Sequence, residues 1–180
     1  MANTESIPKY EIRLNGEYAT ICVECTQDER FGQTRYGGHL LVSSSFGAFA
    51  HQWTHCGEPF HAFLKGISFD SFIMKVRGED AYVFDLEGTI AAVRQRLTDL
   101  AWVPSKEREM RELLDAADLA SASCEFEFMQ KIADIEDEAA EICRNSSCLE
   151  NPESFITVKP DPQLVQFWKE LWPEFLKKLI

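Results

Sequence analysis

Five residues in the first third of this 180-residue chain could bind a metal ion or support thiol chemistry: Cys22, Cys25, His51, His55 and Cys56. Thiolates and imidazole nitrogens are ligands that zinc prefers, so a Cys-x-x-Cys pair with a His-x-x-x-His-Cys run supplies enough donors for a tetrahedral site. Cys56 could instead act as a nucleophile, with His51, His55 or His61 as its base.

The elements expected to carry these residues would separate them. The residues fall in segments with strand-like alternation, where successive side chains point to opposite faces of a sheet. Cys22 and Cys25 would then lie on opposite faces, and the backbones of His51 and His55 would be roughly 13 Å apart. We therefore expect a packed or solvent-facing strand pair, with no metal and no cofactor. A zinc-binding module or a zinc- or thiol-dependent enzyme is the alternative.

The first 56 residues predict antiparallel β-structure. Apolar and polar residues alternate on both sides of Asn15-Gly16, a dipeptide that favours the two-residue turn of a hairpin. The polar residues 26–38 are expected to form a loop, and a second strand pair follows around a turn near Phe46-Gly47. The simplest product is a four-stranded meander with one buried face.

After Gly57 the apolar spacing changes to three or four residues, which predicts helices. Two short helices split near Gly66 precede a short strand at 81–86, and helices dominate from Thr89 onward, with an interruption at Pro173. The expected fold class is α+β: an N-terminal antiparallel β-meander of about four strands followed by a helical C-terminal half. We expect residues 1–86 to hold the sheet and two short helices. Residues 87–180 would form an acidic helical region packed on it in one compact unit.

The net charge of −12 is concentrated in one part of the chain. Residues 107–153 carry 14 acidic and 4 basic side chains, a net charge of −10. Such a chain is not expected to bind a nucleic-acid backbone directly, because that requires clustered Lys and Arg. It is suited to a basic protein surface, including the groove of a nucleic-acid-binding effector. A solvated face that aids solubility would have the same composition.

We expect the partner-binding acidic face to lie on the helices of this region: Glu112, Asp115, Asp118, Glu125, Glu127, Asp134, Glu136, Asp137, Glu138 and Glu141. Trp168 and Trp172 belong to an aromatic stripe near the C-terminus whose simplest place is the core. If exposed, they would contact a partner or a second copy of the chain in a homodimer.

The sequence also indicates where the protein acts. No apolar run reaches about 18 residues, and the N-terminus has neither a basic start nor an apolar stretch, so we expect no membrane helix and no secretory signal. The expected location is the cytoplasm, where the six cysteines stay reduced. No nucleotide-binding or hydrolase motif is present, so we expect a protein that is not an enzyme.

One segment, Leu40–Val76, resembles small accessory proteins of unassigned function encoded by phages and prophages. The residues that carry the resemblance are Ser45, Phe46, Gly47, Phe49, Trp53, Gly57, Phe60, Phe63, Leu64, Asp70, Phe72 and Lys75. The resemblance implies a phage accessory gene and a protein in the host cytoplasm, but no particular activity. Together with the acidic region, it favours an inhibitor of a nucleic-acid-targeting defence system. An anti-CRISPR or anti-restriction protein, acting as a nucleic-acid mimic or by binding a basic patch, would fit.

Overall fold

The chain forms two compact units in the computed structural model, which describes residues 7–30, 32–100, 104–143, 149 and 151–179. Unit 1 combines Met1–Ala81 with Pro160–Ile180, and unit 2 is Tyr82–Lys159. The sequence suggested a different division, after residue 86, with all later helices grouped together. The C-terminal helices instead belong with the sheet, because an amphipathic pattern identifies the apolar face of a helix but not the surface that covers it.

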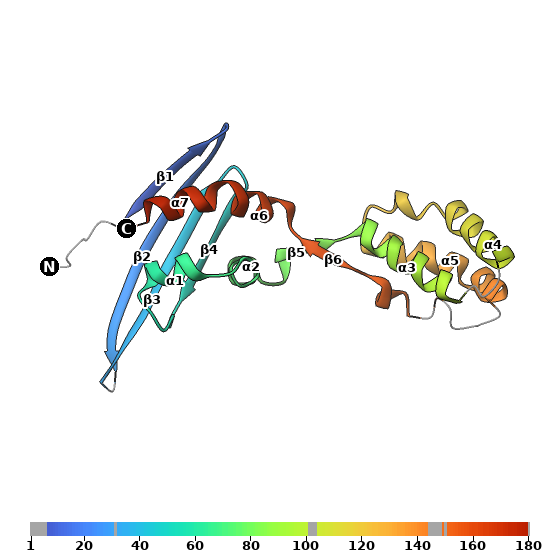
Figure 1. Cartoon of the computed structure of the whole chain (residues 1–180), viewed down its shortest axis with the longest axis horizontal. Coiled ribbons are helices and arrows are strands. Elements are labelled where there is room, and N and C mark those ends of the chain that lie inside the picture. The colour runs from blue at the N-terminus through green and yellow to red at the C-terminus, as the bar shows by residue number, and fades with distance from the viewer. Residues whose placement is uncertain (1–6, 31, 101–103, 144–148, 150, 180) are drawn as a thin grey trace. The chain divides into compact units, whose positions relative to one another are not determined.

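Unit 1 contains a four-stranded sheet and helices from both parts of the chain (Figure 1). Its elements are β1 (Lys9–Leu14), β2 (Glu17–Arg30), β3 (Gln33–Ser44), β4 (Gly47–Trp53), α1 (Phe60–Gly66), α2 (Phe69–Arg77), a 3₁₀ helix (Gly78–Ala81), α6 (Pro162–Gln166), a π-helical turn (Phe167–Leu171) and α7 (Trp172–Lys178). The strands follow one another in the antiparallel order β1-β2-β3-β4.

Unit 2 is mainly helical. Its elements are β5 (Tyr82–Phe84), α3 (Leu86–Leu100), α4 (Pro104–Ala116), α5 (Glu125–Cys143) and two 3₁₀ helices, Leu119–Ser121 and Pro152–Phe155. β5 pairs with β6 (Val158–Pro160) where the chain leaves and re-enters unit 1. The antiparallel sheet followed by a helical half confirms the α+β fold class expected from the sequence.

Both predicted hairpin turns are present. Asn15 and Gly16 have φ angles of 52° and 89°, the left-handed conformation that a two-residue turn between β1 and β2 requires. Between β3 and β4, Ser44 pairs with Gly47, whose φ is 106°. These turns could be predicted because their signal is local and depends on residues that tolerate positive φ.

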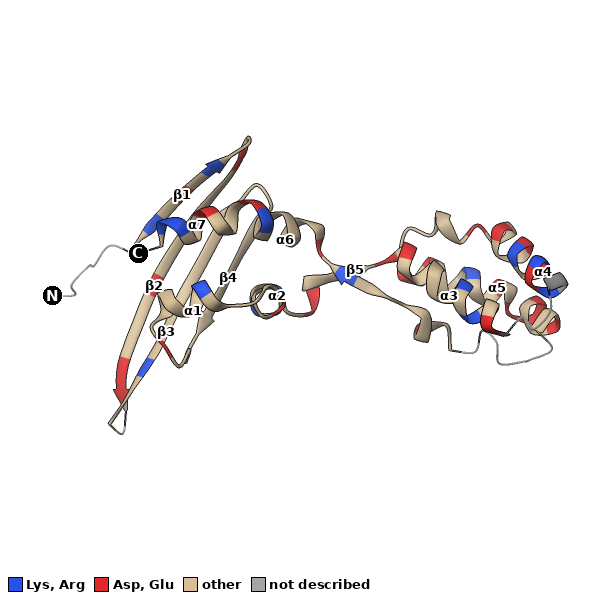
Figure 2. Ribbon diagram, in the orientation of Figure 1, with Lys and Arg blue, Asp and Glu red and all other residues tan. Residues whose placement is uncertain are grey.

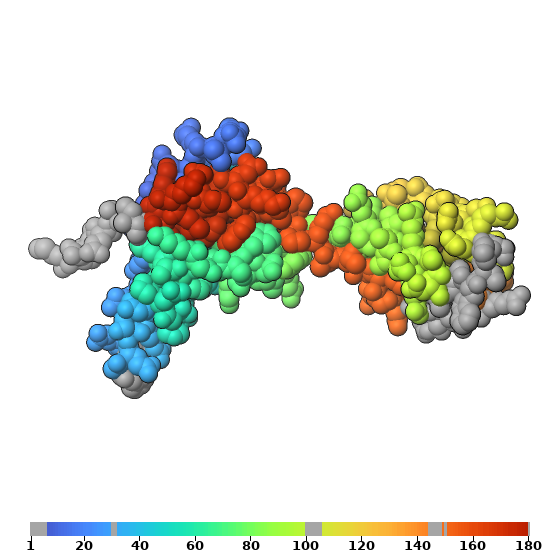
Figure 3. Space-filling view, viewed as in Figure 1, coloured from blue at the N-terminus to red at the C-terminus, as the bar shows by residue number. Residues whose placement is uncertain are grey.

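The prediction of a loop at residues 26–38 is wrong. β2 and β3 continue as a paired ribbon up to Arg30 opposite Gln33, and this end of the ribbon projects as an arm (Figure 3). Residues 25–29 and 32–35 are exposed on both faces of the arm. A ribbon that buries neither face needs no apolar alternation, so the sequence carried no strand signal there.

Helices cover one face of the sheet (Figure 1). Beneath these helices, every second side chain along a strand points toward them, and most of these side chains are buried. Phe49 makes edge-on ring contacts with Phe72 of α2, at 5.8 Å between ring centroids, and with Phe167 of the π-helical turn, at 4.9 Å. Tyr10 of β1 meets Phe175 of α7 in the same geometry at 5.3 Å. The sheet therefore depends on both the middle and the end of the chain for its cover.

Capping side chains mark the starts of α2 and α6. The side chain of Ser68 accepts a hydrogen bond from the backbone N–H of Ser71, and that of Asp161 accepts one from Gln163. An interruption was expected at Pro173, because proline has no backbone N–H to donate within a helix. The structure has a π-helical turn, Phe167–Leu171, just before this proline. Among the helices in the described ranges, none is both long and apolar enough to cross a bilayer.

Candidate partner-binding surface

The excess negative charge of the protein lies mainly in unit 2. Residues 82–159 carry 17 acidic and 8 basic side chains, a net charge of −9, whereas unit 1 carries −3. Figure 2 shows acidic positions on all three long helices of unit 2. The question is which of these carboxylates are already neutralised by neighbours within the chain.

α5 is positioned by a buried stripe and an N-terminal cap. Phe128, Ile132, Ile135 and Ala139 are buried in the core of unit 2, which fixes one side of the helix. Before the helix, Ser123 donates two hydrogen bonds of 2.7 Å, from its backbone N–H and its hydroxyl, to the carboxylate of Glu127. These bonds lower the pKa of Glu127 and anchor the start of α5.

The C-terminal half of α5 exposes a row of carboxylates on the side away from this core. We define the α5 stripe as Asp134, Asp137, Glu138 and Glu141, which are all exposed. Their spacing of three and four residues places them on one side of the helix. Within the part of the chain that the structure describes, none of the four makes an ion pair.

The carboxylates of α4 differ, because each has a basic neighbour. The ion pairs join Lys106 to Glu109 at 2.7 Å, Arg111 to Glu107 at 2.9 Å, Arg94 to Asp115 at 3.6 Å and Arg108 to Glu112 at 3.8 Å. Surface pairs of this kind add little stability, but they neutralise the local charge. Between α4 and α5, the carboxylates without ion pairs in the described structure therefore lie on α5.

The placement of the α5 stripe is unfavourable for the helix itself. Asp134 and Glu138, and likewise Asp137 and Glu141, are like charges four residues apart, an arrangement that costs about 0.2–0.5 kcal/mol per pair. Negative charge near a helix C-terminus also opposes the helix dipole, and the last turn of α5 holds no basic residue. Helix stability therefore does not explain why these carboxylates are where they are.

The other predicted acidic residues are spread around unit 2. Glu112, Asp115, Asp118, Glu125 and Glu127 are exposed, whereas Glu136 is half-buried. Asp118 adopts a left-handed conformation (φ 47°) before the 3₁₀ helix Leu119–Ser121. Glu125 begins α5, where a negative charge is favourable. Only part of the predicted face thus forms one continuous row.

The structure does not bring the five potential zinc ligands together. Cys22 and Cys25 lie on opposite faces of β2, because Cys25 shares the face of the buried Ile21 and Val23. His55 is exposed in the segment after β4. Among the described residues, no group of three or more His, Cys, Asp or Glu side chains could hold a metal ion.

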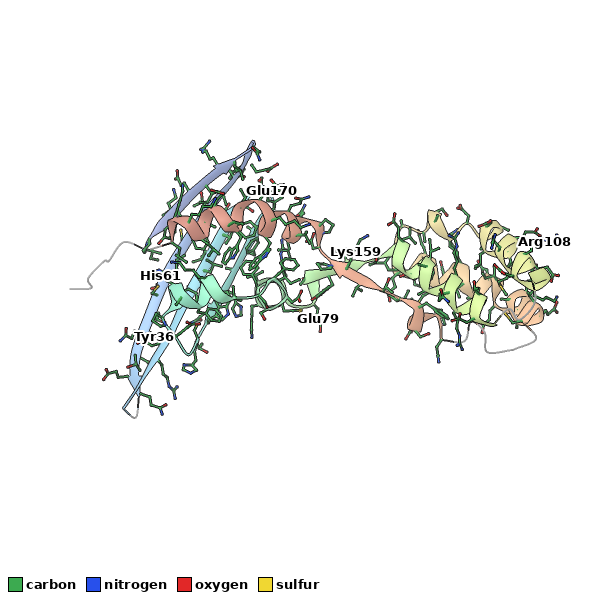
Figure 4. All side chains as sticks on the ribbon, in the orientation of Figure 1. Tyr36, His61, Glu79, Arg108, Lys159 and Glu170 are labelled. Atoms are coloured by element: carbon green, nitrogen blue, oxygen red, sulfur yellow. The ribbon has the colours of Figure 1, made fainter. Side chains whose placement is uncertain are left out.

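The described residues include one thiol–imidazole contact. The Cys25 thiol lies 3.2 Å from Nε2 of His61 on α1, which Figure 4 labels. Cys25 is exposed overall, but the protein atoms around its thiol partly exclude water and thereby raise the pKa of that thiol. Partial burial together with the charge of Glu58 raises the pKa of the Cys56 thiol. Both groups are thus held as thiols, whereas nucleophilic cysteines need a lowered pKa.

His51 has a structural environment. Its ring packs edge-on against Trp53, with centroids 4.5 Å apart. Burial lowers its pKa, and the charge of Lys75 on α2 adds to this effect. His51 is thus favoured in its neutral form in the packing between β4 and α2.

The two C-terminal tryptophans stack on each other, with ring centroids 5.1 Å apart. Trp172 is only 2% exposed and packs against Phe72 and Phe175, so it lies in the core of unit 1. Trp168 is half-buried and is the one of the pair with a surface that a partner could reach.

The sequence profile of a phage protein family, Phage_phiTE_072, matches residues 4–180. The chain belongs to this phage family. The resemblance seen in the segment Leu40–Val76 is thus confirmed and extends over nearly the whole chain, both units included. No curated protein and no solved structure matches the phage protein.

Proposed function

We propose that the phage protein acts in the host cytoplasm by binding a host protein through the α5 stripe. The observation that carries the proposal is the stripe itself: four exposed carboxylates without ion pairs in the described structure, at positions that cost the helix stability. Carboxylates that served solubility alone could lie anywhere on the surface. Residues that reduce stability without an internal role are typical of functional surfaces.

The charge defines the class of partner. A row of carboxylates along a helix attracts Lys and Arg over distances of about 10 Å at ordinary salt concentrations and steers association. Basic surfaces of this kind occur on proteins that bind nucleic acids. A phage benefits from blocking such host proteins, so we propose an inhibitor of a nucleic-acid-targeting defence protein, of the anti-CRISPR or anti-restriction type.

The test is affinity capture from a lysate of a bacterium that the phage infects, with variants that remove the same number of charges from different places. The stripe variant is Asp134→Asn, Asp137→Asn and Glu141→Gln. The control variant removes three exposed carboxylates of unit 1: Glu58→Gln, Glu79→Gln and Asp80→Asn. Figure 4 labels Glu79.

We expect a host protein that is retained by the wild-type chain and the control variant. It should be lost with the stripe variant and when salt is raised to about 1 M, where the screening length falls to about 3 Å. Equal capture by the two variants, or capture that is insensitive to salt, would show that the stripe is not the binding surface.

A further inference from the structure

α4 and α5 enclose a groove that combines apolar and acidic residues. Its volume is about 360 Å³, and the residues that line it are Glu109, Glu112, Leu113, Ala116, Glu138 and Ile142. Leu113, Ala116 and Ile142 provide the apolar part, and the three glutamates provide the acidic part. Glu138 belongs both to this groove and to the α5 stripe.

The neighbouring groove between α3 and α4 has a different balance of charge. It encloses about 280 Å³, and its two carboxylates, Glu107 and Asp115, pair with Arg111 and Arg94, which line the same groove. No basic residue lines the described α4–α5 groove. Two of its glutamates have basic partners outside it: Lys106 pairs with Glu109 at 2.7 Å, and Arg108, labelled in Figure 4, pairs with Glu112 at 3.8 Å. Glu138 makes no ion pair within the described structure, and the pair of Arg108 with Glu112 is largely exposed. Such a weak pair is easily exchanged for one with a partner.

From this combination we propose that the α4–α5 groove binds a basic amphipathic helix of the partner. The proposal rests on the function proposed above and deepens it. An apolar side chain of the helix packs on Leu113, Ala116 and Ile142. A flanking Lys or Arg residue meets Glu138, and a second one replaces Arg108 at Glu112. This is the helix-in-groove mode of recognition, with charge complementarity at the rim.

A helix suits this groove better than an extended strand. Both walls are helices, whose backbone N–H and C=O groups are already used within α4 and α5. A strand would find no backbone partners there, and unpaired backbone groups at an interface are costly. A helix satisfies its own backbone and presents apolar and basic residues together at spacings of three and four.

The experiment uses the full chain and a defined probe. The probe is a fluorescently labelled peptide of leucine and lysine whose helix carries the leucines on one face, compared with a scrambled peptide of the same composition. The groove variant is Ala116→Leu, which fills the groove without changing its charge. The matched control is Ala133→Leu on α5, an exposed alanine that does not line the groove. Circular dichroism and thermal denaturation verify that both variants fold, as expected for leucine in a helix.

We expect the amphipathic peptide to bind the wild-type chain and the Ala133→Leu variant at least about tenfold more tightly than the scrambled peptide. Ala116→Leu should reduce this binding to the level of the scrambled peptide. Equal binding of the two peptides, or binding unchanged by Ala116→Leu, would overturn the groove proposal. The function proposed above would not be overturned by that result. It depends on capture through Asp134, Asp137 and Glu141, which do not line the groove.

Discussion

Glu138 is placed where binding and stability have opposite requirements. Its carboxylate lines the α4–α5 groove together with two glutamates of α4 and stands four residues after Asp134. Glu138→Gln should therefore raise the free energy of unfolding by about 0.2–0.5 kcal/mol at low salt, because it relieves like-charge repulsion. Urea denaturation at two salt concentrations measures the gain, which should shrink as salt screens the charges. A loss of stability would mean that Glu138 has a stabilising partner.

Gly38 of β3 allows α1 to approach the sheet. A Cβ atom at this position would overlap the ring of Phe60, which is buried, and would lie 2.5 Å from the backbone oxygen of Glu24. Gly38→Ala should lower the free energy of unfolding by about 1–3 kcal/mol, as overpacking does.

The matched control is Gly66→Ala, because nothing lies within 4 Å of a Cβ built on Gly66. This substitution should leave the stability unchanged or raise it by up to about 1 kcal/mol, since alanine favours a helix. Thermal denaturation compares the two variants. Similar effects at both positions would contradict the close packing of α1 on Gly38.

At the scale of single elements, α5 depends on its N-terminal cap. Glu127→Gln should destabilise unit 2, because Gln cannot accept the two charge-assisted bonds from Ser123 equally well. The folded state lowers the pKa of Glu127, so the stabilisation is fully present above the ordinary pKa of a glutamate and is lost as the pH falls through the folded value.

Unfolding measured at neutral and at acid pH checks the sign of this effect. The difference between the wild-type chain and the Glu127→Gln variant should be present near pH 7 and should shrink in acid. A difference that persists after the carboxylate is protonated would show that the cap acts through something other than charge.

We expect the fold to remain stable without the arm formed by the ends of β2 and β3. Gln27 pairs with Tyr36 beyond the apolar part of the sheet, so residues 28–35 can be replaced by Asn-Gly without disturbing that pair. The shortened chain should keep its free energy of unfolding within about 1 kcal/mol, because exposed residues are removed and the loop becomes shorter. A larger loss in urea denaturation would assign the arm a structural role.

These elements differ in how far the sequence reveals them. The turns at Asn15-Gly16 and near Phe46-Gly47 depend on neighbouring residues, and both are where the pattern predicts them. The arm was missed because neither of its faces is buried. The predicted acidic face contained the α5 stripe, but helical spacing could not show that the acids of α4 are paired and those of the stripe are not.

For the whole molecule, the two units should respond separately to damage of their cores. Phe72 is buried in unit 1 and Phe128 in unit 2, and replacing either by Ala should cost about 3–5 kcal/mol. Hydrogen–deuterium exchange should show lost protection mainly in the unit that carries the substitution. Equal loss over both units for either variant would indicate one cooperative structure.

Long-range placement was beyond the reach of sequence patterns. The contact between Cys25 and His61 joins residues 36 apart in sequence, and Tyr10 meets Phe175 across nearly the whole chain. The sequence favoured a place in the core for the aromatic stripe that contains Trp172, but it could not tell whether the acidic helices or the sheet would bury this stripe. That choice depends on which apolar surface is left uncovered, a property of the assembled fold.

The insertion of unit 2 into unit 1 determines the order in which the protein can fold during synthesis. Strands β1–β4 leave the ribosome before unit 2, but the π-helical turn and α7 that cover them are made after it. All residues of unit 2 are available before that cover exists. The acidic helices can therefore complete their core before α7 covers the sheet. The nascent chain carries an incompletely covered apolar sheet until the π-helical turn and α7 have been made.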